Sequence, residues 1–363
     1  MKIDKIKLSN FRNLKKLEYE CIDNLNIFVG NNAQGKTNFL EVIYALSTGA
    51  SFRTRNNEDL LNFNSDSLTI RAIYKKQGRQ ISASLKIIRG GKKNFSVNNN
   101  ITGYKNDDRL RVVLFTPDDL YMVKGAPFLR RDFMDFALKQ VSEDYSFHWN
   151  RYKRILKKRN DLLRNNETGK STYQIINEMF VDHACRVIIA RINFVNILDE
   201  IANKVYKKIN QVDEQLKIRY ALSFPIDSGK INIGALKQSM VDHLNQIRDL
   251  EIKRKSSVIG PHVDDVNIYH NNKAARYFAS QGQQRNIALA IKLSEIYTYK
   301  KIMNFYPVFL LDEVLSELDY VKKQQLIDYL ANAEFQSFLT SVHLGKIHGS
   351  NSKITVVENG RFI

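Results

Sequence analysis

Residues 30–37 are the part of the chain that most constrains its fold. Their sequence, Gly30-Asn31-Asn32-Ala33-Gln34-Gly35-Lys36-Thr37, fits the pattern G-x-x-x-x-G-K-[ST]. An apolar stretch from Asn24 to Val29 precedes the loop and predicts a strand, and apolar residues recur at helical spacing from about Lys36 to Ser47. Strand, glycine-rich loop and helix in this order are the context of a phosphate-binding loop. The pattern therefore predicts an α/β nucleotide-binding domain; the alternative is a glycine-rich turn without a ligand.

Each residue type in this loop has a chemical purpose. Gly30 and Gly35 allow backbone conformations and close approaches that a Cβ would block. Backbone N–H groups of the loop and the following helix N-terminus then converge on phosphate oxygens. Lys36 is predicted to neutralise the β- and γ-phosphates, and Thr37 to offer its hydroxyl to Mg²⁺. The predicted nucleotide-binding residues of this segment are Gly30, Asn31, Asn32, Ala33, Gln34, Gly35, Lys36, Thr37 and Asn38.

A second segment supplies two acidic residues. Val308 to Leu311 is a continuous apolar run, as expected of a strand buried on both faces, and Asp312-Glu313 follows it directly. In proteins with a phosphate-binding loop, the first acid holds Mg²⁺, and here it is Asp312. Glu313 is then placed to polarise the attacking water as a general base. Two acids after a strand are weak evidence alone, since helix N-termini favour them, but together with the loop they predict hydrolysis.

A third segment opens a predicted long helix, about Gln283 to Lys301. Its sequence, Ser280-Gln281-Gly282-Gln283-Gln284-Arg285, alone indicates only a capped helix start, but it lies about thirty residues before Asp312. ATP-binding-cassette proteins carry a related signature there, which binds the γ-phosphate held by the opposite protomer. The segment Ser316-Glu317-Leu318-Asp319 then matches the D-loop of that class. The predicted residues are Ser280, Gln281, Gly282 and Gln283, acting in trans, and Ser316 and Asp319 of the D-loop.

The remaining pattern divides the chain into two domains. Residues 1 to about 120 alternate apolar and polar residues and predict strands, including a hairpin with its tip at residues 75–79. Helical periodicity takes over from about Phe128 to Lys253, and strand and helix signals alternate again afterwards. We therefore expect a discontinuous α/β domain, residues 1–125 and 251–363, interrupted by a mostly helical domain at residues 126–250.

The net charge indicates a polyanionic partner. The 363 residues include 56 Lys and Arg against 38 Asp and Glu, a balance of +18. Nucleic acid and anionic membrane surfaces are the usual partners of such a field, although a lysine-rich proteome has the same effect. DNA-contact candidates lie on the predicted hairpin and on a basic helix near Arg151 to Arg159, where plain surface charge is the alternative. The hairpin candidates are Arg71, Lys75, Lys76 and Arg79.

Other classes are disfavoured. Two cysteines, Cys21 and Cys185, provide no disulfide framework, and no apolar run reaches membrane-spanning length. The N-terminus has no hydrophobic core of a secretory signal, so a cytoplasmic protein is expected. No acidic or histidine cluster has the spacing of a further metal site, which disfavours a nuclease.

Taken in order, these motifs resemble the RecF family, bacterial recombination-mediator ATPases related to the SMC-type cassette ATPases. Leu8 to Asn13 is similar to the family's L-x-N-F-R-N, which implies that Arg12 lies near the nucleotide. Further segments resemble the family's S-F-R-T, L-F-[ST]-P-x-D-L and V-G-P-H-R-D-D. These segments are Ser51 to Thr54, Leu114 to Leu120 and Val258 to Asp265, with Val263 in place of the usual arginine.

The resemblance implies a fold, an activity and partners. The fold is an ABC-type P-loop ATPase head, α/β, with a β-rich N-terminal lobe and an inserted helical domain too short for an SMC coiled coil. The activity is slow Mg²⁺-dependent ATP hydrolysis, with Glu313 and Lys36 as catalytic residues and Ser341 or His343 as the switch that senses the γ-phosphate. The implied partners are DNA (duplex, junctions or gaps), a second copy bound in the presence of ATP, and RecO and RecR in recombinational repair.

Two alternatives remain open at this point. The cassette motifs also fit the ATPase subunit of a membrane transporter, but S-Q-G-Q-Q departs from the transporter signature L-S-G-G-Q, and the positive charge favours DNA. The second alternative is a switch in which ATP drives assembly without turnover, against which Glu313 argues.

Overall fold

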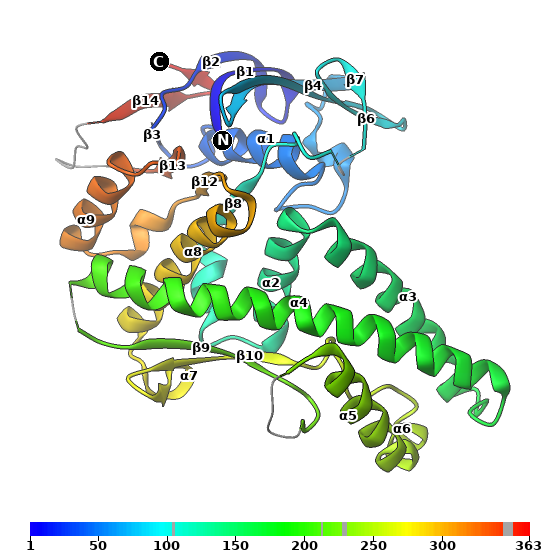
Figure 1. Cartoon of the computed structure of the whole chain (residues 1–363). Coiled ribbons are helices and arrows are strands. Elements are labelled where there is room, and N and C mark those ends of the chain that lie inside the picture. The colour runs from blue at the N-terminus through cyan, green and yellow to red at the C-terminus, as the bar shows by residue number, and fades with distance from the viewer. Residues whose placement is uncertain (104–105, 212, 227–230, 344–350) are drawn as a thin grey trace. The chain divides into compact units, whose positions relative to one another are not determined.

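The computed structural model describes residues 1–103, 106–211, 213–226, 231–343 and 351–363 (Figure 1). The chain divides into two compact units. Unit 1 comprises residues 1–120, 208–211 and 288–363, and unit 2 comprises residues 121–207 and 212–287. Residues 251–287, expected in the discontinuous domain, thus cluster with the helical region. Compact units need not be independently folding domains, so the domain assignment stays a prediction.

The central sheet of unit 1 carries the motifs at one edge. Its strand order is β15-β14-β3-β13-β12-β8, and all strands but β15 run parallel. The phosphate-binding loop follows β3, Asp312 follows β12, and Ser341 ends β13, so parallel pairing brings all three to the carboxyl edge. The predicted strands at 24–29 and 308–311 are confirmed. The bounds are β3 (Leu25–Val29), β8 (Val112–Phe115), β12 (Val308–Leu311), β13 (Ser337–Ser341), β14 (Ser352–Glu358) and β15 (Arg361–Phe362).

An antiparallel sheet forms the N-terminal lobe, in the order β2-β1-β4-β5-β6-β7. Its strands alternate between a buried apolar face and an exposed polar face, as the sequence pattern predicts. The predicted hairpin is confirmed: Gln77 and Gly78 turn between β4 and β5 with φ of 50° and 79°, the signs that a tight hairpin turn requires. The bounds are β1 (Lys2–Phe11), β2 (Leu14–Glu20), β4 (Ser67–Lys76), β5 (Arg79–Ile88), β6 (Lys93–Val97) and β7 (Asn100–Ile101).

Helix α1 (Lys36–Thr48) contacts both sheets of unit 1: β4 and β5 in the lobe, and β8 and β13 in the central sheet. It is buried on most sides, because apolar residues occupy more than one face. Phe39 packs against Phe28 of β3 at 4.9 Å between ring centroids. The remaining helices of this region are η1 (Asn57–Leu60), η2 (Pro117–Met122), α8 (Gln281–Met303), η3 (Val314–Glu317) and α9 (Tyr320–Ala331). Helix α8 confirms the predicted long helix.

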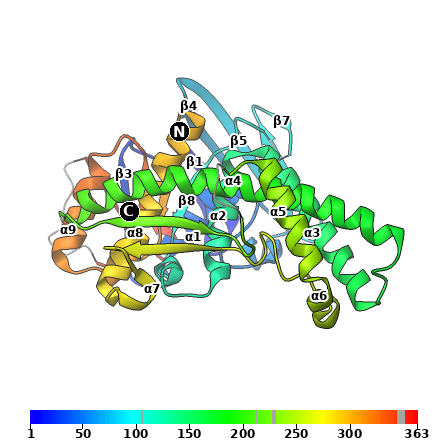
Figure 2. The same ribbon diagram turned by 60° about the horizontal axis from the view of Figure 1, so that its bottom comes forward.

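Unit 2 is mostly helical and also contains a small sheet, β11-β10-β9, that the sequence analysis did not predict. Strand β9 runs beside α4 (Figure 2), where Ile218 donates its N–H to Asp199 Oδ1 at 2.6 Å. The helices are α2 (Pro127–Val141), α3 (Glu143–Arg164), α4 (Ser171–Asn210), α5 (Ile233–Gln246), α6 (Arg248–Arg254) and α7 (Ala275–Phe278). The strands are β9 (Leu216–Ala221), β10 (Asp265–His270) and β11 (Lys273–Ala274).

The segment 258–265 belongs to the core of unit 2. Buried Arg191 donates to the Pro261 carbonyl oxygen at 2.5 Å and to Asp135 Oδ1 at 2.7 Å. Asp264 accepts a hydrogen bond from Tyr220 (2.6 Å), and Asp265 pairs with Arg130 (2.8 Å). Buried charges need such partners, and these contacts explain why residues after 251 cluster with the helical unit.

Among the described residues, no helix combines the length and apolar character needed to cross a bilayer.

Candidate nucleotide site

The glycines of the phosphate-binding loop occupy positions that a side chain cannot take. A Cβ on Gly30 would clash with the carbonyl oxygen of Val357. Gly35 has φ of +115°, and a Cβ there would lie 3.1 Å from Asn13 Oδ1. Both positions therefore select glycine for reasons of packing as well as backbone conformation.

Lys36 lies at the centre of the loop. It is 2% exposed, and its Nζ donates to the carbonyl oxygens of Gly30 (2.8 Å) and Asn31 (2.9 Å). The same ammonium is 3.6 Å from Glu313 Oε1. The loop therefore holds a positive charge where phosphate oxygens are expected.

Asp312 and Thr37 form a set of hard oxygen atoms. The Thr37 and Thr340 hydroxyls each donate to Asp312 Oδ1 at 2.8 Å. Burial raises the pKa of Asp312, and the hydrogen bonds from Thr340 and Thr37 partly oppose that rise. A carboxylate beside a hydroxyl suits Mg²⁺, which usually takes its other ligands from water and substrate phosphates. Within the described residues, no group of three or more His, Cys, Asp or Glu could hold a metal ion by itself.

Glu313 has an unusual backbone for its residue type. Its φ is +50°, in the left-handed region, and its N–H donates to Thr340 Oγ1 at 2.9 Å. This conformation costs energy in a non-glycine residue, and strained residues of this kind are enriched at functional sites. Its side chain lines the pocket beside Lys36.

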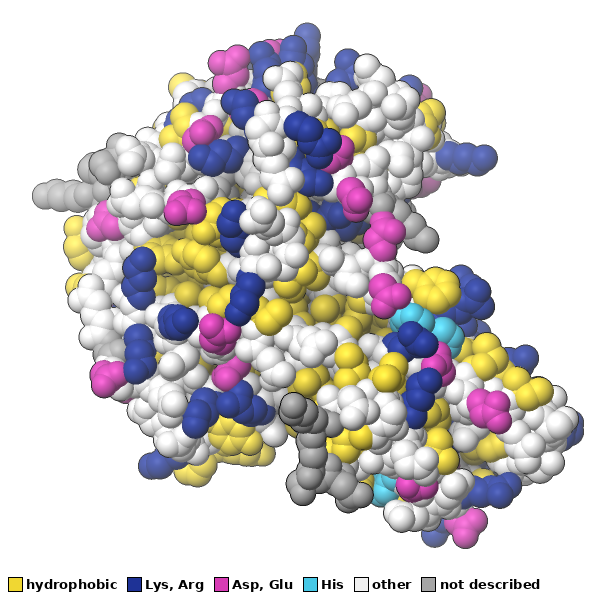
Figure 3. Space-filling model, viewed as in Figure 1, with side chains coloured by type: hydrophobic (Ala, Val, Ile, Leu, Met, Phe, Trp, Pro, Cys, Tyr) yellow, Lys and Arg dark blue, Asp and Glu magenta, His cyan; other side chains and the backbone are white. Residues whose placement is uncertain are grey.

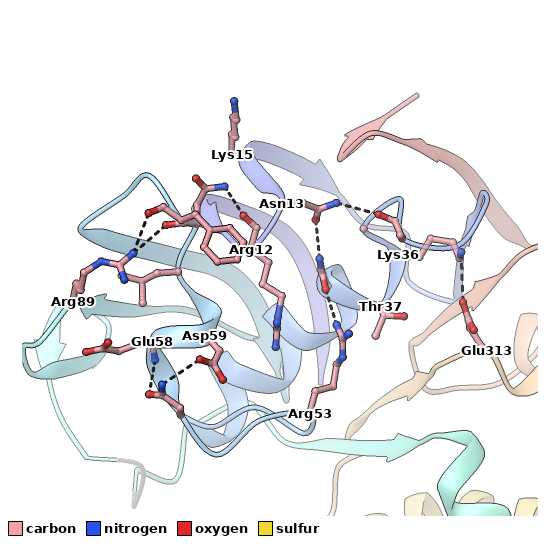
Figure 4. Close-up of a pocket in the computed structure, with 17 residues that line it drawn as sticks. Arg12, Asn13, Lys15, Lys36, Thr37, Arg53, Glu58, Asp59, Arg89 and Glu313 are labelled. Atoms are coloured by element: carbon pink, nitrogen blue, oxygen red, sulfur yellow. Dashed lines mark hydrogen bonds and ion pairs between the residues drawn. The ribbon is translucent and has the colours of Figure 1, made fainter.

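The motifs open into one pocket of about 900 Å³ in unit 1 (Figure 4). Lys36, Thr37 and Glu313 lie at one end, and Glu58 and Arg89 lie at the other. Of the predicted residues, Arg12, Ala33, Gly35, Lys36, Thr37, Asn38 and Glu313 line it. The additional lining residues are Asn13, Lys15, Arg53, Asn56, Glu58, Asp59, Leu61, Asn62, Phe63 and Arg89.

Gln34, predicted to bind nucleotide, instead contacts the C-terminal turn. Its Oε1 accepts a hydrogen bond from the Asn359 N–H (2.5 Å), and its carbonyl oxygen accepts one from Gly360 (2.9 Å). Gly30, Asn31, Asn32 and Gln34 are not among the pocket-lining residues. Gln34 therefore connects the loop to the β14–β15 hairpin.

Glu41 is a site residue that the sequence analysis missed. Its fully buried carboxylate accepts bonds from Arg12 Nε (2.5 Å) and Nη2 (2.8 Å), and from the Ser51 hydroxyl. Arg53 bonds Asn38 Oδ1 at 2.8 Å. A buried carboxylate requires a cationic partner. An acid within the helix predicted after the loop is therefore the sequence feature from which Glu41 could have been identified. Glu41 thereby orients Arg12 and the Ser51–Thr54 segment toward the pocket.

The signature segment in unit 2 begins α8 with a reciprocal cap. Ser280 Oγ accepts a bond from the Gln283 N–H (3.2 Å), and Gln283 Oε1 accepts one from the Ser280 N–H (2.9 Å). A Cβ on Gly282 would meet no heavy atom within 4 Å among the described residues beyond its own helix and neighbours. Just before it, Tyr277 and Phe278 are 76% and 69% exposed. The motif thus faces open space beside exposed aromatic rings.

The D-loop and switch residues also have local contacts. Ser316 Oγ donates to the Glu313 carbonyl oxygen (2.7 Å), and Asp319 caps α9 by accepting from the Lys322 N–H (2.9 Å). Ser341 is buried, and its carbonyl oxygen accepts a bond from the Gly30 N–H at 3.3 Å. His343 is exposed. Of the two switch candidates, Ser341 is thus the one bonded to the phosphate-binding loop.

The structure removes two residues, Lys76 and Arg159, from the DNA-contact candidates. Lys76 is buried, and its Nζ donates to the Asp107 carbonyl oxygen (2.7 Å) and to Asp108 Oδ1 (3.1 Å). Arg159 is buried at the end of the predicted basic stretch and pairs with Glu251 at 2.6 Å. Ammonium and guanidinium groups held in this way cannot reach a phosphate backbone.

The other hairpin candidates differ in exposure and in their ion pairs with acidic residues. Arg79 is exposed but pairs with Asp108 (2.9 Å), and Lys75 pairs with Asp4 (3.3 Å). Arg71 lies on the exposed face of the lobe, directly across from Lys7 of β1. Lysine and arginine side chains gather over β1 and β4 at the top of Figure 3. Arg71 is therefore the candidate that the structure favours.

Comparison with known proteins identifies the family. The family described as "RecF/RecN/SMC N terminal domain" matches residues 2–361. "DNA replication and repair protein RecF" of Oceanobacillus iheyensis is 34% identical over 357 residues, 96% of this chain and 95% of the relative. The protein of that name in Ligilactobacillus salivarius is also 34% identical, over 99% of this chain and 97% of its own length.

Solved structures of the same family also match the chain. "Structure of the recombination mediator protein RecF-ATPrS in RecFOR pathway" has a TM-score of 0.89 and 30% identity, and covers 99% of this chain and 97% of that one. An SMC head bound to the C-winged helix domain of ScpA has a TM-score of 0.57 at 15% identity, covers 100% of this chain and 96% of that one, and shares the fold. These matches confirm the predicted ABC-type ATPase head and give the transporter alternative no support. The chain therefore belongs to the RecF/RecN/SMC N-terminal-domain family and, by its full-length relatives, to the RecF ATPases within it.

Proposed function

We propose that the chain is an ATP-dependent DNA-binding protein of DNA replication and recombinational repair, with slow ATP turnover. The pocket that joins Lys36, Thr37 and Glu313 carries this proposal, because it unites a phosphate cradle with a carboxylate that can accept a proton. A matched structure named as RecF-ATP supports ATP as the nucleotide. The RecFOR pathway named for the same structure supports RecO and RecR as partners.

The residues present fit ATP and Mg²⁺. The loop N–H groups, Lys36 and Arg12 would hold the phosphates, and Thr37 and Asp312 would hold Mg²⁺. The bound ion would neutralise phosphate charge. Glu313 would orient the attacking water and take its proton on a carboxylate oxygen. Ser341, bonded to the loop through its carbonyl oxygen, is proposed as the γ-phosphate sensor.

The signature segment supports ATP-dependent dimerisation. Open space beside Gly282 and two exposed aromatic rings leave room for a second copy. The Ser280 hydroxyl and the α8 N-terminus would then meet the γ-phosphate held by Lys36 of the partner molecule. Because only ATP offers a γ-phosphate, its binding would favour the closed dimer over the open state. The D-loop residues Ser316 and Asp319 would lie at the same interface.

The exposed face of the N-terminal lobe is proposed to contact DNA. Lys5, Lys7 and Arg71 line a hollow of about 440 Å³ there, with the hydroxyls of Ser84 and Ser96 across neighbouring strands. Lys7 also pairs with Glu18 (3.0 Å) and Lys5 with Glu20 (3.1 Å), so Arg71 is the main cationic candidate of this face. Cationic and hydroxyl groups in this arrangement suit phosphate oxygens rather than base edges. The face would therefore bind duplex without reading its sequence.

Charge reversal tests this face. The double variant Lys7→Glu/Arg71→Glu is expected to weaken duplex binding in ATP and to reduce the salt slope, d log K/d log[salt], by about 2, since each phosphate contact contributes about 0.9. Fluorescence anisotropy over a salt series measures both quantities. The matched control is Lys253→Glu/Arg254→Glu, which makes the same charge change at exposed positions of α6. Equal losses of duplex affinity in the two variants would show that binding depends on the net charge of the chain and not on this face.

A further inference from the structure

Phe63 lines the nucleotide pocket and is 97% exposed. Isolated exposed apolar side chains are common on protein surfaces and need no explanation by themselves. This one projects from the wall of a pocket that otherwise consists mostly of polar and charged side chains.

The loop that carries Phe63 is held by several hydrogen bonds. Arg89 Nη2 donates to the carbonyl oxygens of Asn62 (3.3 Å), Phe63 (3.4 Å) and Ser65 (3.1 Å). Asn62 donates its N–H to the Asn10 carbonyl oxygen (2.9 Å) and its side-chain amide to the Arg12 carbonyl oxygen (2.6 Å). The aromatic ring is therefore presented on a fixed backbone next to the end of β1, so little conformational entropy is lost on contact with a ligand.

The length of the pocket separates the phosphates from the base. Figure 4 shows Lys36, Thr37 and Glu313 at one end and Arg89 at the other, with Arg12 and Asn13 between them. Since Arg89 bonds the Phe63 carbonyl oxygen, Phe63 belongs to the end remote from Lys36. A nucleoside triphosphate with its terminal phosphates at Lys36 would extend its base toward that end if it follows the length of the pocket.

We propose that Phe63 is the residue on which the nucleotide base stacks, with Arg89 holding its loop in place. The inference rests on the proposed ATP binding and adds a base subsite to it. An aromatic face stacks on the π-face of any base and more strongly on a purine, whose two rings give a larger overlap. Phe63 would thus contribute affinity for the nucleoside part of the ligand and a preference for purine over pyrimidine.

Isothermal titration with ATP and UTP in Mg²⁺ tests the proposal. Phe63→Ala is expected to raise the Kd for ATP by about tenfold, the effect of losing one base–aromatic stack, and to reduce the ratio of ATP to UTP affinity. Phe63→Tyr keeps the ring and is expected to bind ATP like the unchanged chain. Because the side chain is exposed, the melting temperatures of the two variants should match that of the parent.

The outcomes separate the two hypotheses. If the unchanged chain does not bind ATP, the proposed function fails and the base subsite fails with it. If the unchanged chain binds ATP, an unaltered Kd in Phe63→Ala overturns the stacking role alone. An equal rise of the Kd for ATP in Phe63→Tyr and Phe63→Ala also overturns the stacking role. Phe63→Tyr keeps the aromatic ring, so loss of stacking could not explain its weaker binding.

Discussion

Glu313→Gln is expected to lower the ATP turnover rate by about 100-fold or more, with ATP affinity close to that of the unchanged chain. Glutamine preserves the size of the side chain and the 3.6 Å approach of its oxygen to Lys36, but it cannot accept a proton from water. Loss of a general base typically costs this factor or more. Phosphate release measures the turnover rate, and titration calorimetry measures the ATP affinity.

The matched control for this variant is Glu334→Gln, an exposed acid outside the pocket. It is expected to leave turnover and affinity unchanged. A loss below about tenfold in Glu313→Gln would assign proton acceptance to another group. Loss of ATP binding together with turnover would instead make Glu313 a structural residue of the pocket.

Gly282→Asp is expected to abolish ATP-dependent dimerisation without unfolding the monomer. The new Cβ meets no heavy atom within 4 Å in the described part of the chain outside its own helix and neighbours, and an acid near the start of α8 suits the helix dipole. In a dimer, the same carboxylate would face the γ-phosphate of the partner's ATP and repel it. Sedimentation velocity in saturating ATP should therefore show dimers for Glu313→Gln and monomers for Glu313→Gln/Gly282→Asp.

Gly234→Asp provides the comparison for this substitution. Gly234 is also an exposed glycine near the start of a helix, α5, and belongs to no proposed site. In the Glu313→Gln background, this variant should still dimerise with ATP. Dimers of normal affinity in the Gly282→Asp variant would remove the signature segment from the interface.

Much of the nucleotide site could be predicted from the sequence because its chemistry is local. The spacing of Gly30, Gly35 and Lys36 and the acids after a buried strand are contiguous patterns. Parallel strand pairing then brings Asp312 near Thr37 without further information. The hairpin and helix α8 follow in the same way from turn residues and periodicity.

The features that could not be predicted depend on partners far away in the chain. Lys76 and Arg159 lie in basic stretches typical of an exposed surface. In the structure each is buried and paired with an acid, 32 residues later in the chain for Lys76 and 92 residues later for Arg159. Gln34 is bound by a turn 325 residues away. No sequence pattern identifies Phe63, because an exposed phenylalanine in a polar loop cannot be distinguished by sequence from one that is buried in the core. Burial and pairing of single side chains are tertiary properties that periodicity does not report.

We expect ATP to gate the binding of DNA, and the affinity for duplex in the two nucleotide states tests this. Fluorescence anisotropy with duplex DNA, in Mg²⁺ at one fixed salt concentration, compares the chain in ATP and in ADP, with single-stranded DNA of equal length alongside. Tight duplex binding in ATP and weak duplex binding in ADP are expected. Equal affinity for duplex DNA in ATP and in ADP would contradict this expectation, because the γ-phosphate would then have no effect on DNA binding.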